Sequence, residues 1–248
     1  MRTIYFLWLR QIKKYFRSRS RIVGSVGQPL LFLLALGYGL GSVYKSAGQG
    51  NYLTFLVPGI MAQTVLFSAM FFGAMIIFDK QFGFLKETLV APVSRFKIML
   101  GGALGGATTA VIQGILVFII SLFLGFRPLH WVDTLLVLIF MSVLALSITS
   151  FSSAIGSFVE DMQGFQAINQ FIVFPLYFLS GALYPLTRVP DWLRIIAEIN
   201  PISYTVDAMR WAMIGTSRFG LYHDLIAMGI TLVLMLVFGA VRFRYIEA

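Results

Sequence analysis

Six long stretches of this sequence contain no Asp, Glu, Lys or Arg, and each is long enough to cross a lipid bilayer. A helical crossing needs roughly 20 mostly apolar residues. Because a chain in lipid must satisfy its own backbone hydrogen bonds, only helices and closed barrels span membranes, and these continuous apolar runs lack the alternation of a barrel. The six stretches are Ile22–Tyr44, Ser46–Phe78, Ile98–Phe126, Thr134–Val159, Met162–Thr187 and Leu225–Val241.

Composition excludes an ordinary water-soluble domain. The chain is 58% hydrophobic and 12% charged, whereas soluble domains have roughly 45–50% apolar and 25% charged residues. We therefore predict an all-α membrane protein of six transmembrane helices that forms a single domain over residues 1–248. Its predicted spans are residues 22–44, 53–78, 98–126, 134–159, 163–186 and 225–242.

Basic residues are distributed unequally between the two sides of this six-span arrangement. Of the 19 Lys and Arg residues, 13 flank the span ends that share a side with both termini. Basic residues accumulate on the cytoplasmic side of membranes, so we predict a multi-pass protein of the cell (inner, or cytoplasmic) membrane with both termini cytoplasmic. This bias and contact with anionic lipid explain the net charge of +9, and no nucleic-acid partner is expected.

Residues 1–20 have the pattern of a helix that lies along the membrane surface. Ile4, Leu7 and Trp8 fall on one helical face, whereas Arg10 and Lys13 gather on another. Such a helix buries its aromatic side chains among lipid headgroups and directs its basic groups toward lipid phosphate or a partner. A simple topology anchor is the alternative interpretation.

Residues 79–95, between the second and third predicted spans, form the most informative cytoplasmic segment. Phe82, Leu85 and Leu89 fall on one face of a short helix, and Pro92 ends that helix because it lacks a backbone donor. An amphipathic helix that faces the cytosol needs a cover for its apolar face. Lipid headgroups and a docking cleft on another protein are both compatible with this pattern.

Small residues recur at helical spacing within the third predicted span. Gly101 and Gly105 form one pair, and Gly102 and Gly106 form another. Such pairs let two helix backbones approach closely. We interpret them as close helix packing, with a flexible hinge or pore lining as the alternative.

The stretch Ser180–Arg210 is divided by prolines into short pieces, and we assign residues 187–212 to outer interfacial helices. Pro185, Pro190 and Pro201 separate pieces that are too short to cross a bilayer but carry apolar residues, Trp and Arg. This composition is typical of helices that dip into the outer membrane interface. We therefore predict short re-entrant outer helices.

Residue types that perform catalysis or bind metals are scarce. Cysteine is absent, and the only histidines, His130 and His223, lie far apart in the sequence. Glu160 and Asp161 are adjacent and cannot face each other on a helix. The sequence also has no Gly-x-x-x-x-Gly-Lys-Ser/Thr phosphate loop. We predict that the chain is not an enzyme, that it holds no cofactor or metal, and that any energy source lies on another chain.

The polar residues within the predicted spans are uncharged. A proton- or sodium-coupled carrier is expected to place carboxylates near the middle of the membrane, so this pattern disfavours such a carrier. We interpret most of these residues as contacts between helices and a minority as contacts with cargo. They are Gln28, Gln63, Thr64, Ser68, Thr108, Thr109, Gln113, Ser142, Ser147, Thr149, Gln166, Asn169 and Gln170.

Two segments carry a family resemblance that extends over essentially the whole chain. One is Gly83-Phe-Leu-Lys-Glu-Thr-Leu-Val-Ala-Pro-Val-Ser-Arg95. The other runs from Phe174-Pro-Leu-Tyr-Phe-Leu-Ser-Gly through Asn200-Pro-Ile-Ser-Tyr-Thr-Val-Asp-Ala-Met-Arg210. Together they resemble the permeases of ABC-2 type exporters, including daunorubicin-resistance and nodulation lipo-oligosaccharide export permeases.

This resemblance implies a permease subunit that moves its cargo outward, as a homodimer or a pseudo-homodimer with a similar chain. Two copies of a separate ABC ATPase would drive it, with ATP and Mg bound to that partner. The weakly polar, aromatic-rich spans favour an amphipathic or hydrophobic cargo such as a drug, lipid or glycolipid. The alternatives are a nucleotide-independent secondary carrier or channel, a polysaccharide-exporting ABC permease, and an intramembrane enzyme.

The resemblance also implies roles for three sets of residues. The N-terminal helix and a coupling helix would contact the ATPase, the outer segment would close the exit, and the first, second and fifth spans would line the route. The coupling residues are Gly83, Phe84, Leu85, Glu87, Pro92 and Arg95. The outer-gate residues are Pro185, Pro190, Trp192, Asn200, Pro201 and Tyr204. The pathway residues are Gln63, Asn169, Phe174 and Tyr177.

Overall fold

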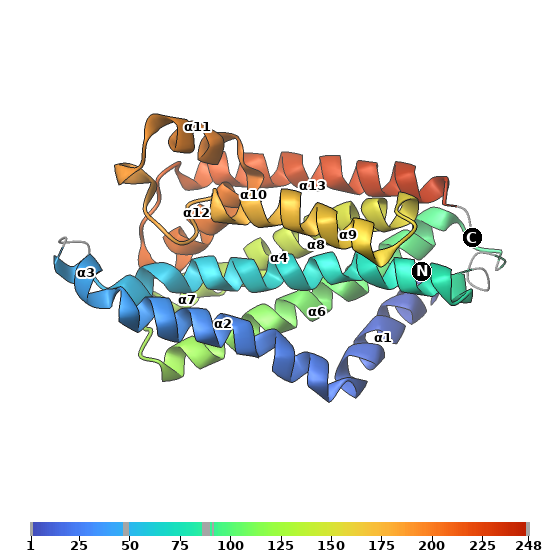
Figure 1. The fold of residues 1–248 in the computed structure, drawn as a ribbon, viewed down its shortest axis with the longest axis horizontal. Coiled ribbons are helices and arrows are strands. Elements are labelled where there is room, and N and C mark those ends of the chain that lie inside the picture. The colour runs from blue at the N-terminus through green and yellow to red at the C-terminus, as the bar shows by residue number, and fades with distance from the viewer. Residues whose placement is uncertain (1, 47–49, 86–89, 91, 247–248) are drawn as a thin grey trace.

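A computed structural model describes residues 2–46, 50–85, 90 and 92–246 of the chain. Within these ranges the chain consists of helices and short connections, and no strand occurs among the described residues. The long helices lie roughly side by side in an elongated bundle, and both ends of the chain lie at the same end of the bundle (Figure 1). We call this the terminal end and the opposite end the distal end.

Five helices are long and apolar enough to cross a membrane. They confirm the prediction of an all-α membrane protein. The second, third, fourth and sixth predicted spans agree with the observed helix bounds to within four residues, because the uncharged runs in the sequence coincide with the helices. The five are α2 (Arg19–Gly39), α4 (Tyr52–Gln81), α6 (Arg95–Phe123), α8 (Leu136–Phe158) and α13 (Leu221–Arg244).

The predicted fifth span, residues 163–186, is a shorter helix than its apolar run indicates. A π turn ends at Val173, two residues before Pro175, which has no N–H to continue an ordinary helical ladder. The chain then turns at Gly181, whose φ of +74° favours glycine. The helical pieces are α9 (Met162–Ile168), the π turn η1 (Asn169–Val173) and α10 (Phe174–Phe178). The count of six crossings stays a prediction.

Helix α4 is the centre of the bundle and is buried along most of its length. It packs against α8, α6 and α2 (Figure 1). At Gly73 a Cβ would lie 2.3 Å from the carbonyl oxygen of Ser152, and a Cβ at Gly156 would lie 2.6 Å from the Gly73 carbonyl oxygen. The Ser152 hydroxyl accepts from the Gly73 N–H at 2.6 Å. Glycine on both helices therefore allows contact between their backbones.

Helix α1 (Arg2–Arg17) packs against α6. A Cβ at Gly105 would lie 2.6 Å from the Cβ of Gln11. The indole N–H of Trp8 donates to the Thr108 hydroxyl at 3.0 Å. These contacts agree with the close-packing interpretation of the glycine pairs, and they make α1 a fixed part of the bundle.

The distal end carries the short helices α3 (Gly41–Ser46), α7 (Trp131–Thr134), η2 (Leu186–Arg188), α11 (Asp191–Ile199) and α12 (Pro201–Ile214). Helix α11 is amphipathic and mostly exposed, as expected for an interfacial helix. Helix α12 is instead buried against α4, α8 and α13, and the interfacial position of residues 187–212 stays a prediction. Two charged side chains of α12 have partners within the protein: Asp207 accepts from the Ser217 hydroxyl and Arg210 donates to two carbonyl oxygens.

We predict that Gly73→Ala destabilises the bundle, because the added methyl group would meet the backbone of α8. Overpacking of this kind costs about 1–3 kcal/mol. Gly229→Ala on α13 is the matched control, because a Cβ there meets nothing within 4 Å. Thermal unfolding in lipid nanodiscs should show a lower midpoint for Gly73→Ala alone. Equal midpoints for the two variants would contradict the close backbone contact.

Candidate functional site

The chain between α4 and α6 lies at the terminal end (Figure 1), and several of its described apolar side chains are exposed. Phe82 is 70% exposed, Val90 is 84% exposed and Phe84 is about half exposed. Gly83, with a φ of +77°, turns the chain at the end of α4. Leu85 is buried in a small apolar cluster with residues of α4, α6 and α13. One apolar side chain thus anchors this segment, while Phe82 and Val90 lie at the surface.

The other predicted coupling residues differ in their surroundings. Pro92 is exposed just before α6. Arg95 donates from Nη1 to the carbonyl oxygens of Arg244 at 2.7 Å and Ile246 at 2.8 Å. Glu87 lies outside the described residues. The guanidinium of Arg95 therefore ties the start of α6 to the end of α13, a use that the sequence did not indicate.

Asp79, near the end of α4, lies beside two basic residues of α1. Arg10 Nη2 and Lys14 Nζ are each 3.9 Å from one of its carboxylate oxygens. Both basic side chains are about half exposed, so each pair contributes about 0–1 kcal/mol. A groove lined by these three residues also contains Phe82 and Phe84. The basic face of α1 and the exposed aromatic side chains thus form one continuous surface at the terminal end.

Two predicted outer-gate residues join elements of the distal end. The side-chain oxygen of Asn200 accepts from the Ile202 N–H at 3.0 Å and caps α12. Its Nδ2 donates to the Leu176 carbonyl on α10. The hydroxyl of Tyr204 donates to the Glu198 carbonyl at the end of α11. These two side chains hold α10, α11 and α12 together.

The other predicted outer-gate residues shape turns or lie at the surface. Pro185 and Pro190 precede η2 and α11, and Pro201 is the first residue of α12, where its missing N–H has no cost. Trp192 is 60% exposed on α11. An exposed Trp on a short amphipathic helix is typical of a membrane–water interface.

Arg210 is a buried cation that links α12 to α4 and to the turn at Gly181 and Ala182, which we call the distal turn. Its Nη2 donates to the carbonyl oxygens of Gly181 at 2.9 Å and Ala182 at 2.8 Å. Its guanidinium carbon lies 3.8 Å from the centroid of the Phe55 ring. A Cβ at Gly59 of α4 would lie 2.2 Å from the Ala182 carbonyl oxygen. A buried cation is costly without partners, so Arg210 and the turn at Gly181 stabilise each other.

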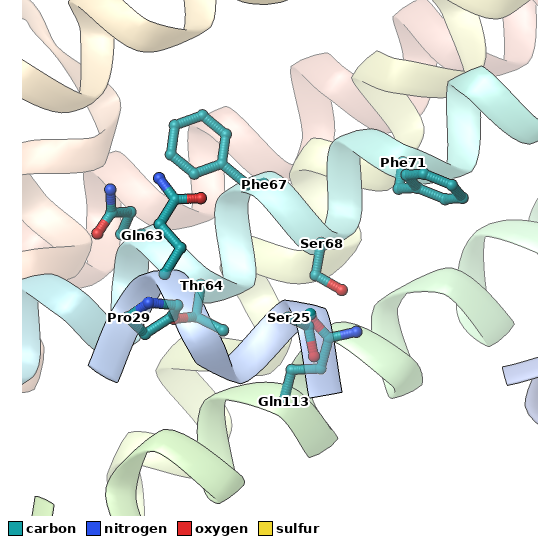
Figure 2. A pocket seen from close by; sticks show the side chains of 10 residues that line it. Ser25, Pro29, Gln63, Thr64, Phe67, Ser68, Phe71 and Gln113 are labelled. Atoms are coloured by element: carbon teal, nitrogen blue, oxygen red, sulfur yellow. The ribbon is translucent and has the colours of Figure 1, made fainter. Parts of the chain in front are cut away.

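A pocket of about 320 Å³ lies between α2, α4 and α6. Figure 2 shows that α4 contributes one wall, with α2 and α6 facing it. The residues that line it are Gly24, Ser25, Gln28 and Pro29 from α2, Gln63, Thr64, Phe67, Ser68 and Phe71 from α4, and Gln113 from α6.

The polar groups of this pocket are only partly paired. The hydroxyls of Ser25 and Thr64 donate to carbonyls of their own helices at 2.8 and 2.9 Å. Gln63 and Gln113 are 2% and 3% exposed. Among the described residues, neither amide atom of Gln63 nor the Ser68 hydroxyl has a hydrogen-bond partner. The pocket lining therefore contains buried polar groups that have no hydrogen-bond partner in the described part of the chain.

Phe67 connects the pocket to the other predicted pathway residues. Its ring centroid lies 4.6 Å from that of Phe174 and 6.1 Å from that of Tyr177. The Tyr177 hydroxyl donates to the Gly59 carbonyl at 3.4 Å. Asn169 lies in the π turn, and its side-chain oxygen has no partner among the described residues. The structure thus brings Phe174 and Tyr177 close to the pocket that contains Gln63.

Sequence reasoning did not select Arg210, Phe67 or Ser68 for any of these sites. Arg210 carries a signal, because a charged residue within an apolar segment indicates a special role. Phe67 has none, since it is one of 24 Phe residues. Ser68 is recognisable as a polar residue in a span, but only its neighbours on α2 and α6 distinguish it from a contact between helices.

The candidate catalytic residues form no catalytic arrangement in the described part of the chain. No group of three or more His, Cys, Asp or Glu among the described residues could hold a metal ion. Asp161 caps α9 by accepting from the Gly164 N–H, and Glu160 is exposed beside it. These positions suit a short connection between helices and give no support to an intramembrane enzyme.

Together, the spanning helices and the uncharged pocket define a polytopic membrane protein with an interior suited to binding. The chain matches the model of the ABC-2 type transporter family over residues 2–214. It therefore belongs to the ABC-2 type transporter family.

Curated relatives agree with this assignment. The inner membrane transport permease YadH of Escherichia coli strain K12 is 30% identical, over 84% of this chain and 82% of its own length. The ycf38 protein of Cyanophora paradoxa is 30% identical over 94% and 84%, respectively. Nodulation protein J of Rhizobium leguminosarum bv. viciae is 26% identical over 79% and 76%. The class of this protein is thus a membrane transport permease.

We predict that Arg210→Met destabilises the protein by about 3 kcal/mol, because two hydrogen bonds from a charged donor are lost and two carbonyls are left unpaired. Arg194→Met is the matched control, since the Arg194 side chain is exposed and, among the described residues, pairs only with Asp191 of its own helix. That change should cost less than about 0.5 kcal/mol. Unfolding midpoints in nanodiscs measure both. A similar small effect of the two changes would show that Arg210 does not hold the distal turn.

Proposed function

We propose that this chain is the membrane-spanning subunit of an ATP-driven exporter whose ATPase is a separate chain. The observation that carries the proposal is the family match over residues 2–214, which covers most of the chain. The sequence has no phosphate-binding loop of its own. ATP and Mg would therefore bind to the partner ATPase, present in two copies.

The surface that would receive the ATPase is the terminal-end surface formed by the basic face of α1 and the segment between α4 and α6. Phe82 and Val90 are exposed there, and lipid or protein must cover such side chains. Leu85 would transmit movement into the bundle because it is packed against α4, α6 and α13. Gly83 and Pro92 would fix the shape of the segment, and Arg95 would act through the end of α13.

The face that would join two copies of the permease contains the fifth predicted span. Gln163, Gln166 and Gln170 are exposed along this segment, although amides are poorly suited to lipid. Between Leu225 and Val241, the exposed side chains of α13 are apolar by contrast, as lipid contact requires. They are Leu225, Ile226, Ile230, Val233, Leu234, Val237 and Val241. This contrast supports a homodimer, or a pseudo-homodimer with a similar chain, that buries the glutamine face.

The transport route would run along this face, lined by the first, second and fifth spans. Closure of the two ATPases would push the terminal-end segments and change the packing of the two bundles. Asn200 and Tyr204 would open or close the exit because they join the three distal helices. Pro185, Pro190, Trp192 and Pro201 would shape that gate.

The cargo would be amphipathic or hydrophobic and would leave the cell. Both termini would face the cytoplasm, in agreement with their position at one end of the bundle (Figure 1). YadH, a relative, is an inner membrane transport permease, which supports a location in the cell membrane. A polysaccharide exporter and a nucleotide-independent carrier are the alternatives, and ATP dependence separates the second from the proposal.

We predict that Val90→Asp disrupts assembly with the ATPase, because a charge would enter the apolar part of the proposed contact. The permease is co-expressed with the ATPase encoded beside it, and both co-purification and ATPase activity in vesicles are measured. Val132→Asp is the matched control, because Val132 is 77% exposed on α7 at the distal end. We expect at least tenfold less bound ATPase for Val90→Asp and no loss for Val132→Asp.

Equal assembly of both variants with the ATPase would move the contact away from this segment. Export that continues without nucleotide, or a complete lack of association with any ATPase, would favour the nucleotide-independent carrier instead.

We predict that Gln170→Cys forms a disulfide between two copies in the membrane. The chain has no native cysteine, so a single introduced thiol reports only on its own surroundings. Val233→Cys, 60% exposed on α13, is the control on the apolar face. Mild oxidation should give a dimer band for Gln170→Cys and none for Val233→Cys. The reverse pattern would place the dimer contact on α13.

A further inference from the structure

The pocket between α2, α4 and α6 contains polar groups that have no hydrogen-bond partner among the described residues. Gln63 is 2% exposed, yet neither atom of its amide has a hydrogen-bond partner among the described residues. By helical rise, Gln63 lies about 17 Å from one end of α4 and about 27 Å from the other, well inside the span. An unpaired amide at that depth is costly. A bound molecule that pairs with this amide would remove the cost.

The lining determines what kind of group fits. The polar lining residues are three amides and three hydroxyls, and no described lining residue is charged. Amides donate and accept hydrogen bonds, so they suit a group that does both. A charged headgroup would leave water without gaining a counter-ion, which is unfavourable. The volume of about 320 Å³ is at the lower end of the range for small-molecule sites and is sufficient for one headgroup.

The surroundings of the pocket suit an apolar chain attached to that headgroup. Figure 2 shows Thr64 and Ser68 pointing from α4 toward α2 and α6, whereas Phe67 points to the other side of α4. Pro29 of α2 lines the pocket, and Leu31, two residues later in the same helix, is 66% exposed. A chain leaving the pocket could therefore follow the apolar surface of α2.

On the basis of the proposed exporter function, we propose that this pocket is the cargo-recognition site. It selects amphipathic molecules whose headgroup is uncharged and rich in hydroxyl or amide groups, and it discriminates against charged headgroups. Gln63 and Ser68 bond the headgroup from α4, Gln113 bonds it from α6, and the exposed Gln28 on α2 lies at the opening.

Photolabelling of the full-length permease in lipid nanodiscs tests this assignment. The probe is a dodecyl glucoside with a photoactivatable group in its alkyl chain, and labelled peptides are located by mass spectrometry. Unlabelled dodecyl glucoside, dodecyl phosphate and dodecyltrimethylammonium serve as competitors. We expect labels on α2 and α4 around the pocket. The glucoside should compete about tenfold better than either charged amphiphile.

Substitution of Gln63 separates a binding role from a structural one. Gln63→Leu should weaken labelling about tenfold, because hydrogen bonds to the headgroup are lost. It should leave the unfolding midpoint unchanged or raise it, because an unpaired amide is removed. Gln63→Glu should weaken glucoside labelling and make dodecyltrimethylammonium the better competitor. Ser142→Leu, on an exposed position of α8 outside the pocket, is the control and should change neither measurement.

Three results would overturn the inference. These are labelling elsewhere in the bundle, equal competition by the charged amphiphiles, or a Gln63→Leu variant that is destabilised while labelling persists. If Gln63→Leu does not fold, Gln113→Leu provides the same test from α6. If the permease does not assemble with an ATPase but the pocket is still labelled, the proposed exporter function is wrong and this inference stands. If ATP drives transport but the label lies outside the pocket, this inference is wrong and the exporter function stands.

Discussion

The structure depends on helix α4 touching its neighbours backbone to backbone. Helices in lipid gain little from hydrophobic burial against each other, so close packing and hydrogen bonds hold them together. Gly73 provides such a contact with α8, and Gly59 provides one with the distal turn at Ala182. Between these two contacts, from Gln63 to Phe71, α4 lines the pocket. The pocket is thus bounded along α4 by two points that tolerate no added side chain.

Besides those that pair with another helix, such as Ser152 and Thr108, the polar residues of the spans include two groups with different physical meaning. Those such as Thr149 and Ser150 donate to carbonyls of their own helix and are buried, so they cost little. Those such as Gln63 and Ser68 are enclosed but unpaired. A fold built only for stability would replace the second group by apolar residues. The presence of Gln63 and Ser68 in the lining of one pocket supports the proposed cargo site.

The sequence predicted the features that depend on local composition. Uncharged runs located the long helices, because the length of a bilayer crossing and the absence of charge are visible without the fold. It could not predict that α12 is buried, because that depends on Arg210 reaching the carbonyls of Gly181 and Ala182. Nor could it show that Arg95 bonds the end of α13, or which of many glutamines would share a pocket. These depend on contacts between residues far apart in the chain.

Of the three helices that line the pocket, α2 is the one that can move most easily and so change the shape of the pocket. Helices α4 and α6 are held by close glycine contacts with α8 and α1, respectively. Of the residues in the apolar stretch Ile22–Gly39 of α2, only 17% are buried, against 83% in the most apolar stretch of α4. Moving α2 therefore breaks few contacts, whereas moving α4 would disrupt the core. In the proposed exporter, α2 follows α1 directly in the chain, so a force applied to α1 by an ATPase reaches the wall of the pocket that is least firmly held.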